Sequence, residues 1–166
     1  MLELVTSKIA MMMAAIIILA SVLGIYAIQR NQAIELELKN IADKISGTIK
    51  NLNDLQGETK VIVAFDEGDG DVYVKPYIDG KRYEIMITSN KVFITQDDRH
   101  YISDFTGLIH LWVPLSNTYN QTQIQYLDDE NRKLEFESGQ DFEIERKFVE
   151  IGGEDKYMTF VYLREV

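Results

Sequence analysis

Four carboxylates crowd into one short stretch of the chain and are the first residues that suggest chemistry. Asp66, Glu67, Asp69 and Asp71 lie within six consecutive positions that also hold two glycines, and calcium takes oxygen ligands from loops of this kind. The spacing departs from the EF-hand pattern, which requires a glutamate at its twelfth position. A solvated hairpin tip accounts for the same residues, so no metal site is assigned, and Asp66, Asp69 and Asp71 are kept as candidate ligands.

The two histidines, His100 and His110, are the other candidates for metal binding or catalysis. Neither has a second histidine at ligand spacing. The chain has no cysteine, which excludes disulfides, thiolate ligands and cysteine nucleophiles. We expect His100 in a turn and His110 on a strand. Because no nucleophile, base and orienting group can be assembled from the sequence, we expect no enzyme and no cofactor.

A third chemical signal is the triplet Asn120-Gln121-Thr122, an acceptor sequence for N-glycosylation. It lies in a polar stretch between expected strands. The prediction of glycosylation at Asn120 is supported only if this part of the chain is outside the cell.

The charge balance restricts the partners. Lys and Arg total 17 against 27 Asp and Glu, which gives a net charge of −10. A protein this acidic repels phosphate backbones and releases no counterions from them. Nucleic acid is therefore not expected as a partner.

An uninterrupted apolar segment decides the class of the protein. Residues 9–28 run for twenty positions without a charge, which as a helix spans about 30 Å, the thickness of a bilayer core. The segment is apolar on every side, whereas a buried helix of a soluble protein usually keeps a polar stripe. A signal peptide has a shorter apolar region and a small-residue cleavage site, which the flank Gln29-Arg30-Asn31 lacks. We predict a helix that lies in a membrane or in the core of a filament.

The same helix continues beyond Arg30 with a single apolar face. Its apolar residues recur every three or four positions, at Ile34, Leu38, Ile41, Ile45, Ile49 and Leu52. No proline interrupts the pattern, and Gly57 offers a C-terminal stop. We predict one helix over residues 1–55, with a hydrophobic half at 1–28 and an amphipathic half at 29–55. The amphipathic half needs an apolar partner, either the chain's own β-domain or the helices of neighbouring copies.

From residue 60 onward the period changes to the alternation typical of strands. Strands are expected at residues 60–65, 72–77, 83–88, 91–95, 108–113, 122–127, 133–137, 142–151 and 157–164. Turn sequences separate them, among them the hairpin dipeptide Asp79-Gly80. The sequence therefore predicts an α+β fold, in which a long N-terminal hydrophobic helix precedes an antiparallel β-sandwich-like domain at residues 60–166.

Several residues of the helix are candidates for contacts between copies. Small side chains let helices approach closely, which singles out Ala10, Ala14, Ala15, Ser21 and Gly24. Ile16 and Ile17 lie among them, and Ile34, Leu38, Ile41, Ile45 and Ile49 form the later apolar face. Glu3 and Lys8 flank the start of the apolar run. In a lone membrane helix they mark the interface, and in a bundle Glu3 of one copy neutralises the terminal amine or Lys8 of the next.

The chain resembles archaeal type IV pilins and pilin-like (class III signal) proteins. The similar stretches are residues 9–28 (IAMMMAAIIILASVLGIYAI), residues 33–53 (AIELELKNIADKISGTIKNLN) and residues 78–94 (IDGKRYEIMITSNKVFI). The resemblance implies a subunit that inserts into the membrane, loses a short basic leader to a membrane peptidase and is polymerised by the pilus assembly machinery. Its helices then form the core of an extracellular filament at the cell surface, with the β-domains outside.

The start of the chain departs from that family pattern, because no basic leader precedes the apolar run. Either Met1 begins the mature subunit, or the chain is an unprocessed, single-pass accessory protein that binds an envelope component, such as the β-domain proteins of the archaellum base. Lys8 precedes the helix and Arg30, Lys39 and Lys44 follow it, which favours a cytoplasmic C-terminal side. A removed basic leader would reverse that count. Adhesion, motility, conjugation and DNA uptake all stay open as the role of such a filament.

Overall fold

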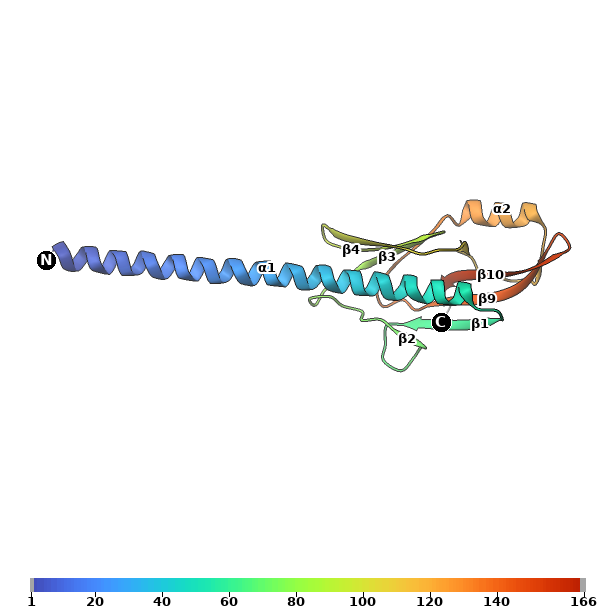
Figure 1. Cartoon of the computed structure of the whole chain (residues 1–166), viewed down its shortest axis with the longest axis horizontal. Coiled ribbons are helices and arrows are strands. Elements are labelled where there is room, and N and C mark those ends of the chain that lie inside the picture. The colour runs from blue at the N-terminus through green and yellow to red at the C-terminus, as the bar shows by residue number, and fades with distance from the viewer. Residues whose placement is uncertain (1, 165–166) are drawn as a thin grey trace. The chain divides into compact units, whose positions relative to one another are not determined.

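A computed structural model describes the backbone of residues 2–164 and the side chains of residues 7–164. The chain begins with one long helix, α1 (Leu2–Asp54), and continues into strands and a second helix, α2 (Gln121–Glu130) (Figure 1). It divides into two compact units, Met1–Leu36 and Glu37–Val166, and α1 runs through the boundary between them. The predicted α+β fold, a long apolar N-terminal helix followed by a β-rich part, is confirmed.

The strands of the C-terminal unit form two sheets. The first sheet has the spatial order β2 (Val72–Tyr73), β1 (Thr59–Ala64), β9 (Phe142–Ile151), β10 (Glu154–Leu163) and β6 (Ile109–His110), with β7 (Thr118–Tyr119) also beside β9. The second sheet has the order β5 (Arg99–Asp104), β4 (Lys91–Gln96), β3 (Glu84–Thr88) and β8 (Lys133–Glu137). The second sheet is antiparallel throughout, as expected. The first is mixed, because the three short strands β2, β6 and β7 pair in parallel with longer ones.

The hairpins follow the turn residues in the sequence. Asp79 and Gly80 have φ values of 51° and 75°, the two positive values that a type I′ turn requires, and a bridge joins Ile78 to Lys81 around them. Ser89 and Asn90 connect β3 to β4 in the same two-residue spacing. At Gly70 the close approach of β1 demands glycine, because a Cβ there would lie 2.7 Å from the carbonyl oxygen of Ile62.

One predicted strand is a helix. Residues 122–127 were expected to be extended, but they lie in α2. The Asn120 side chain accepts a hydrogen bond from the Gln123 amide, and the Gln123 side chain accepts one from the Asn120 amide, which is the capping box of a helix start. Ile124 and Leu127, three residues apart, then share the helix face that packs on the first sheet.

The main core of the C-terminal unit surrounds residues 37–54 of α1. Leu38, Ile45 and Ile49 are each at most 1 % exposed. The second sheet contacts the helix through the hydrogen bond of 2.8 Å between Ser46 and Ser103. The first sheet contacts it through the bond that the Thr159 hydroxyl donates to the Asn53 side chain. The two sheets meet at Phe136 and Phe142, whose ring centroids are 5.1 Å apart. The helix is thus part of the core that both sheets share.

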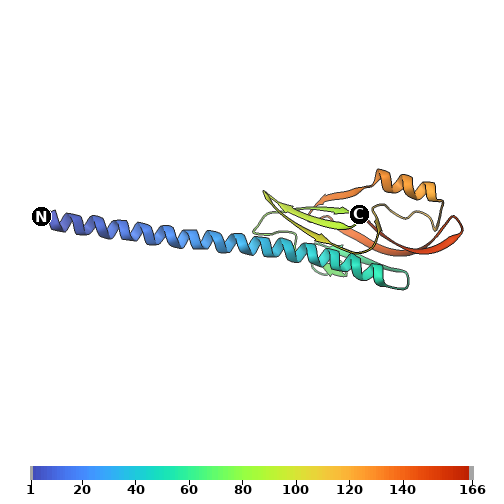
Figure 2. The ribbon, with the colours of Figure 1, turned by 45° about the horizontal axis from the view of Figure 1, so that its top comes forward.

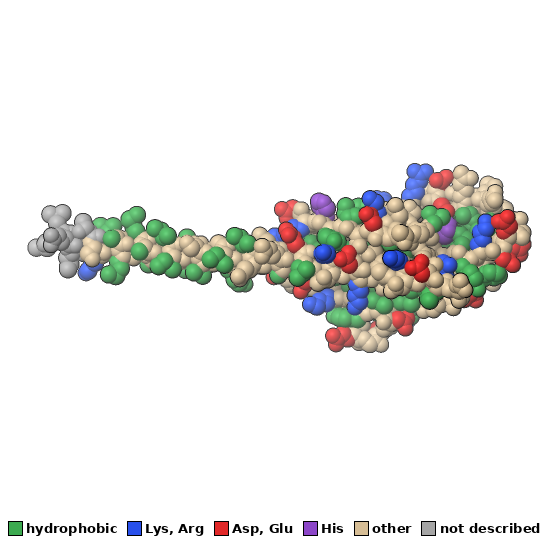
Figure 3. Space-filling model, viewed as in Figure 1, with side chains coloured by type: hydrophobic (Ala, Val, Ile, Leu, Met, Phe, Trp, Pro, Cys, Tyr) green, Lys and Arg blue, Asp and Glu red, His purple; other side chains and the backbone are tan. Residues whose placement is uncertain are grey.

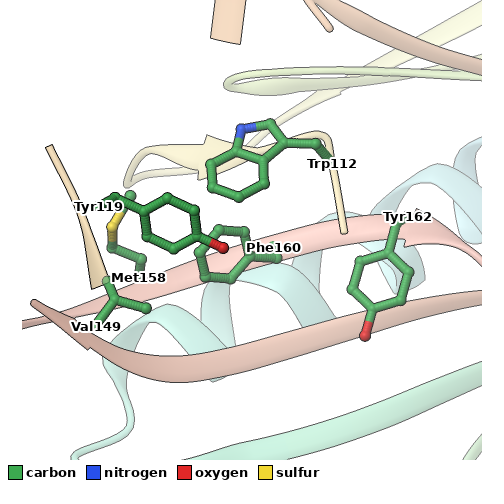
Figure 4. Packing of buried hydrophobic residues seen from close by; sticks show 6 residues of the cluster. All are labelled: Trp112, Tyr119, Val149, Met158, Phe160 and Tyr162. Atoms are coloured by element: carbon green, nitrogen blue, oxygen red, sulfur yellow. The ribbon is translucent and has the colours of Figure 1, made fainter. Parts of the chain in front are cut away.

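A second, smaller core lies on the opposite face of the first sheet. Because side chains alternate along a strand, Met158, Phe160 and Tyr162 of β10 point away from residues 37–54 of α1. Trp112 and Tyr119 cover them (Figure 4). α2 closes this core, and Figure 2 shows the strands of the first sheet between α2 and the end of α1.

We expect the substitution Ile45→Ala to destabilise the C-terminal unit. Ile45 is fully buried, and truncation of a buried isoleucine to alanine costs about 2–5 kcal/mol through lost burial and the cavity that remains. Chemical unfolding of the full chain in detergent, followed by near-UV circular dichroism, measures this loss. Ile17→Ala is the matched control, since Ile17 lies on the same helix but is 63 % exposed. Equal unfolding midpoints for the two variants would contradict the shared core.

Candidate functional site

The largest exposed apolar surface of the described chain is the N-terminal part of α1. Residues 7–33 are exposed on all sides, and side chains such as Met11, Ile16 and Ile18 are 71 %, 66 % and 64 % exposed. This part of α1 is long and apolar enough to cross a membrane. Figure 3 shows apolar side chains covering it, whereas charged side chains gather over the C-terminal unit. It is therefore the principal candidate for a membrane or assembly surface.

The small side chains of this surface fall mainly on one face. Positions 10, 14, 17, 21, 24 and 28 follow one another at intervals of four and three, so Ala10, Ala14, Ser21 and Gly24 line up with Ile17 between them. The Ser21 hydroxyl donates to the Ile17 carbonyl oxygen at 2.8 Å, which satisfies it within the helix. Ala15 lies about 100° away from Ala14 around the axis and belongs to a different face. Ile16 is likewise off this face.

The amphipathic half of α1 has its partner within the chain. The predicted assembly residues Leu38, Ile41, Ile45 and Ile49 are between 0 % and 7 % exposed, and the two sheets of the same chain cover them. Ile34, one turn earlier, is 6 % exposed. Of the two partners that the sequence allowed, the structure gives Leu38, Ile41, Ile45 and Ile49 the chain's own β-domain, so these four residues are unavailable to other copies. The candidate surface is reduced to the hydrophobic half.

Of the two charged residues at the start of α1, Lys8 has a described side chain and Glu3 does not. The side chain of Glu3 lies outside the described residues. Lys8 is exposed. The pairing of Glu3 with a neighbouring copy stays a prediction.

In the acidic loop between β1 and β2, one carboxylate is hydrogen-bonded to the backbone of the neighbouring strand. Asp71 accepts a hydrogen bond of 2.9 Å from the Ile62 amide, which joins the loop to β1. Asp66 and Asp69 line a surface cleft together with Asp141 and Arg164, whose guanidinium lies 3.8 Å from the Asp141 carboxylate. Within the described residues, no group of three or more histidines and carboxylates is arranged to hold a metal ion.

His110 has a role that the sequence did not reveal. It lies on β6, is 4 % exposed, and its Nδ1 is 2.7 Å from the Asp128 carboxylate on α2. Asp128 also accepts a bond of 2.9 Å from Trp112 Nε1. One carboxylate thus fastens α2 to His110 of β6 and to Trp112 in the loop that follows β6. The contact joins residues far apart in sequence, and a histidine alone gave no signal of its partner. His100, expected in a turn, is exposed on β5.

Two buried tyrosines are held as hydrogen-bond donors. Burial raises the pKa of the Tyr83 hydroxyl, which donates to the Lys75 carbonyl oxygen at 2.5 Å. Burial, and then its bond of 2.6 Å to Glu145, raises the pKa of Tyr162. Both phenols stay protonated at neutral pH, so they act as fixed structural donors.

Asn120 is both the predicted glycosylation site and the residue that caps the start of α2. It is exposed and its side-chain oxygen caps α2 at 2.8 Å. The side-chain nitrogen, which would carry a glycan, is not used by the cap. Glycosylation of Asn120 stays a prediction.

We expect Asp128→Ala to loosen α2. The change leaves the His110 and Trp112 donors without their acceptor, and each unsatisfied buried donor costs about 1–3 kcal/mol. The chain has one tryptophan, so Trp112 fluorescence during urea unfolding reports on the site directly. Asp129→Ala is the control, because Asp129 is 61 % exposed and pairs only with Arg132 at the surface. If both variants unfold at the same midpoint, the carboxylate does not fasten the helix.

In comparisons with known proteins, no family model, curated protein or solved structure matches this chain.

Proposed function

We propose that this protein is a structural subunit of an extracellular, type IV pilus-like filament, polymerised through the hydrophobic half of α1 with its β-domain exposed outside. The observation that carries the proposal is the fully exposed, uncharged surface of residues 9–28. Such a surface is stable in water only if something covers it, since each fully buried large apolar side chain gains about 1.5–3 kcal/mol. Lipid covers it in the membrane, and sister helices cover it after the subunit leaves.

The face of small side chains supports packing against sister helices. In lipid, association of helices depends on close van der Waals contact, because the tails are as apolar as the side chains. Ala10, Ala14, Ser21 and Gly24 reduce the bulk of one face, whereas Met12, Leu19 and Leu23 lie on the opposite one. A helix that only anchors a protein in lipid needs no face of small side chains. A pilus assembly machinery would be the remaining partner, and no cofactor is needed.

A second candidate function is that of a single-pass protein, anchored in the membrane by residues 9–28, whose β-domain binds an envelope or archaellum-base component. One observation favours it. Residues 37–54 of α1 are docked on the chain's own sheets, as Leu38 and Ile45 show by their burial. Burial of the amphipathic half therefore requires no other copies. What covers residues 9–28, lipid or sister helices, decides between an anchor and a filament subunit.

We expect Gly24→Leu to shorten or abolish filaments. A Cβ at Gly24 meets no atom of the same chain, and leucine favours the helix more than glycine by about 0.8–1 kcal/mol, so the fold is spared. The added side chain instead holds neighbouring helices apart. Negative-stain electron microscopy of assembled material, with sedimentation to measure the polymerised fraction, records the effect.

Val22→Leu is the control for that substitution. Val22 is 56 % exposed and lies about 160° from Gly24 around the helix axis, so the enlarged side chain should leave filaments intact. Equal polymerisation of the two variants would remove the small-residue face from the assembly. If the unmodified chain yields only dispersed monomers, both in cells and after detergent removal, the filament proposal fails and the membrane-anchored protein takes its place.

A further inference from the structure

A long part of the C-terminal unit carries no charge. Residues 105–127 contain no Asp, Glu, Lys or Arg, although charged residues make up 27 % of the chain and its net charge is −10. Copies with this charge repel one another wherever their acidic surfaces meet. The cores of protein interfaces are depleted in charged residues. The uncharged segment is thus the part of the β-domain at which two copies approach most easily.

The most exposed apolar side chain of the segment, that of Leu115, projects from an ordered loop. Leu115 is 91 % exposed, the highest value among the exposed large apolar side chains of the described chain. Hydrogen bonds hold the loop on both sides of it. Lys147 Nζ donates to the Pro114 carbonyl oxygen at 3.3 Å, and the Ser116 amide donates to the Tyr119 hydroxyl at 2.9 Å. Leu115 is therefore presented in a fixed position, which lowers the entropy cost of binding.

The same segment also forms one wall of an open cleft of about 560 Å3. β6 pairs only with Thr159 and Phe160 of β10, so the preceding residues of β10 form a free strand edge, and the cleft lies along it. Ile124, Ile151 and Met158 contribute apolar side chains to its lining. The cleft is also lined by Asp54, Asp128, Arg146 and Lys156, whose two negative and two positive formal charges cancel. Leu108, which is 65 % exposed, stands at its rim. Leu115 is not among the lining residues, so the loop does not fill the cleft of its own chain.

We propose that Leu115 of one copy docks into this cleft on the next copy. The projecting residue and the cleft are different places on one domain, so the contact is head-to-tail and repeats without closing unless the rotation happens to form a ring. An open-ended contact of this kind is what a filament requires of its outer domains. The inference rests on the proposed function, because α1 must first bring the copies together.

The absence of cysteine from the chain allows a direct test by disulfide crosslinking. Full-length Leu115→Cys chains and full-length Ile124→Cys chains, one of them tagged, are mixed in detergent, assembled and oxidised. Because each chain has a single cysteine, every disulfide joins two copies. Mixed dimers are expected to exceed those of a Leu115→Cys and Ile102→Cys mixture by about tenfold, because docking holds position 115 beside Ile124 of the next copy and away from Ile102, which raises the effective concentration of one thiol at the other. Ile102 is 42 % exposed on β5, in the other sheet.

A mixed dimer no more abundant than in the Ile102→Cys control overturns the inference, and so does a predominance of dimers between two Leu115→Cys chains, which indicates a symmetric contact. Electron microscopy of the same samples separates this failure from that of the filament. Filaments without the mixed crosslink reject the docking of Leu115 but leave the proposed function standing. In samples that form no filament the proposed function has failed, and since docking needs copies assembled through α1, the inference falls with it.

Discussion

Burial of one stripe of α1 holds the folded part of the chain together. Leu38, Ile45 and Ile49 are almost completely buried, and each contributes about 1.5–3 kcal/mol relative to an exposed position. The two sheets pack against this stripe, and strands as short as β2 and β6, with two residues each, have little stability of their own. Residues 37–54 are therefore part of the core of the β-domain, although they belong to the same helix as the apolar segment.

Polar contacts along the stripe fix where the helix lies on the sheets. Apolar burial is non-directional and alone would tolerate a shift of the helix. Ser46, 5 % exposed, bonds to Ser103, and Asn53 bonds to Thr159, which also accepts from Arg146. A shift would leave these groups without partners, at a cost of about 1–3 kcal/mol for each buried group. Apolar contacts supply the stability, and the polar ones select a single register.

The sequence determined the helix and the hairpins more clearly than the contacts between them. Two periodicities were visible locally: apolar residues every three or four positions from Ile34 to Leu52, and alternation along strands such as β9. The long helix and most of the expected strands are present, because local geometry decides them. The strands expected at 72–77 and 108–113 are shorter, only Val72–Tyr73 and Ile109–His110, and β5 was not predicted. α2 was missed because Thr122, Ile124 and Tyr126 alternate as in a strand, although the capping pair Asn120 and Gln123 was also present.

Contacts between distant segments were not predictable in this way. The pairing of His110 with Asp128, and the parallel additions of β6 and β7, depend on which loops the fold brings to the first sheet. The partner of the amphipathic stripe was open for the same reason: periodicity reveals that a face is buried but not which surface covers it. In the structure the chain's own sheets cover the amphipathic stripe. Of the apolar surface of α1 in the described chain, residues 9–28 then remain exposed, and the function depends on what covers them.

The distribution of charge makes self-association compatible with a net charge of −10. Surface charges interact over about 8 Å at physiological salt, so repulsion depends on which surfaces come close and not on the total. Residues 9–28 carry no charge, and residues 105–127 carry none on the β-domain. In a filament built through α1 as proposed, contact at both surfaces would leave most of the remaining carboxylates toward solvent. The acidic surplus would then disfavour approach through the other surfaces and so favour one register between copies.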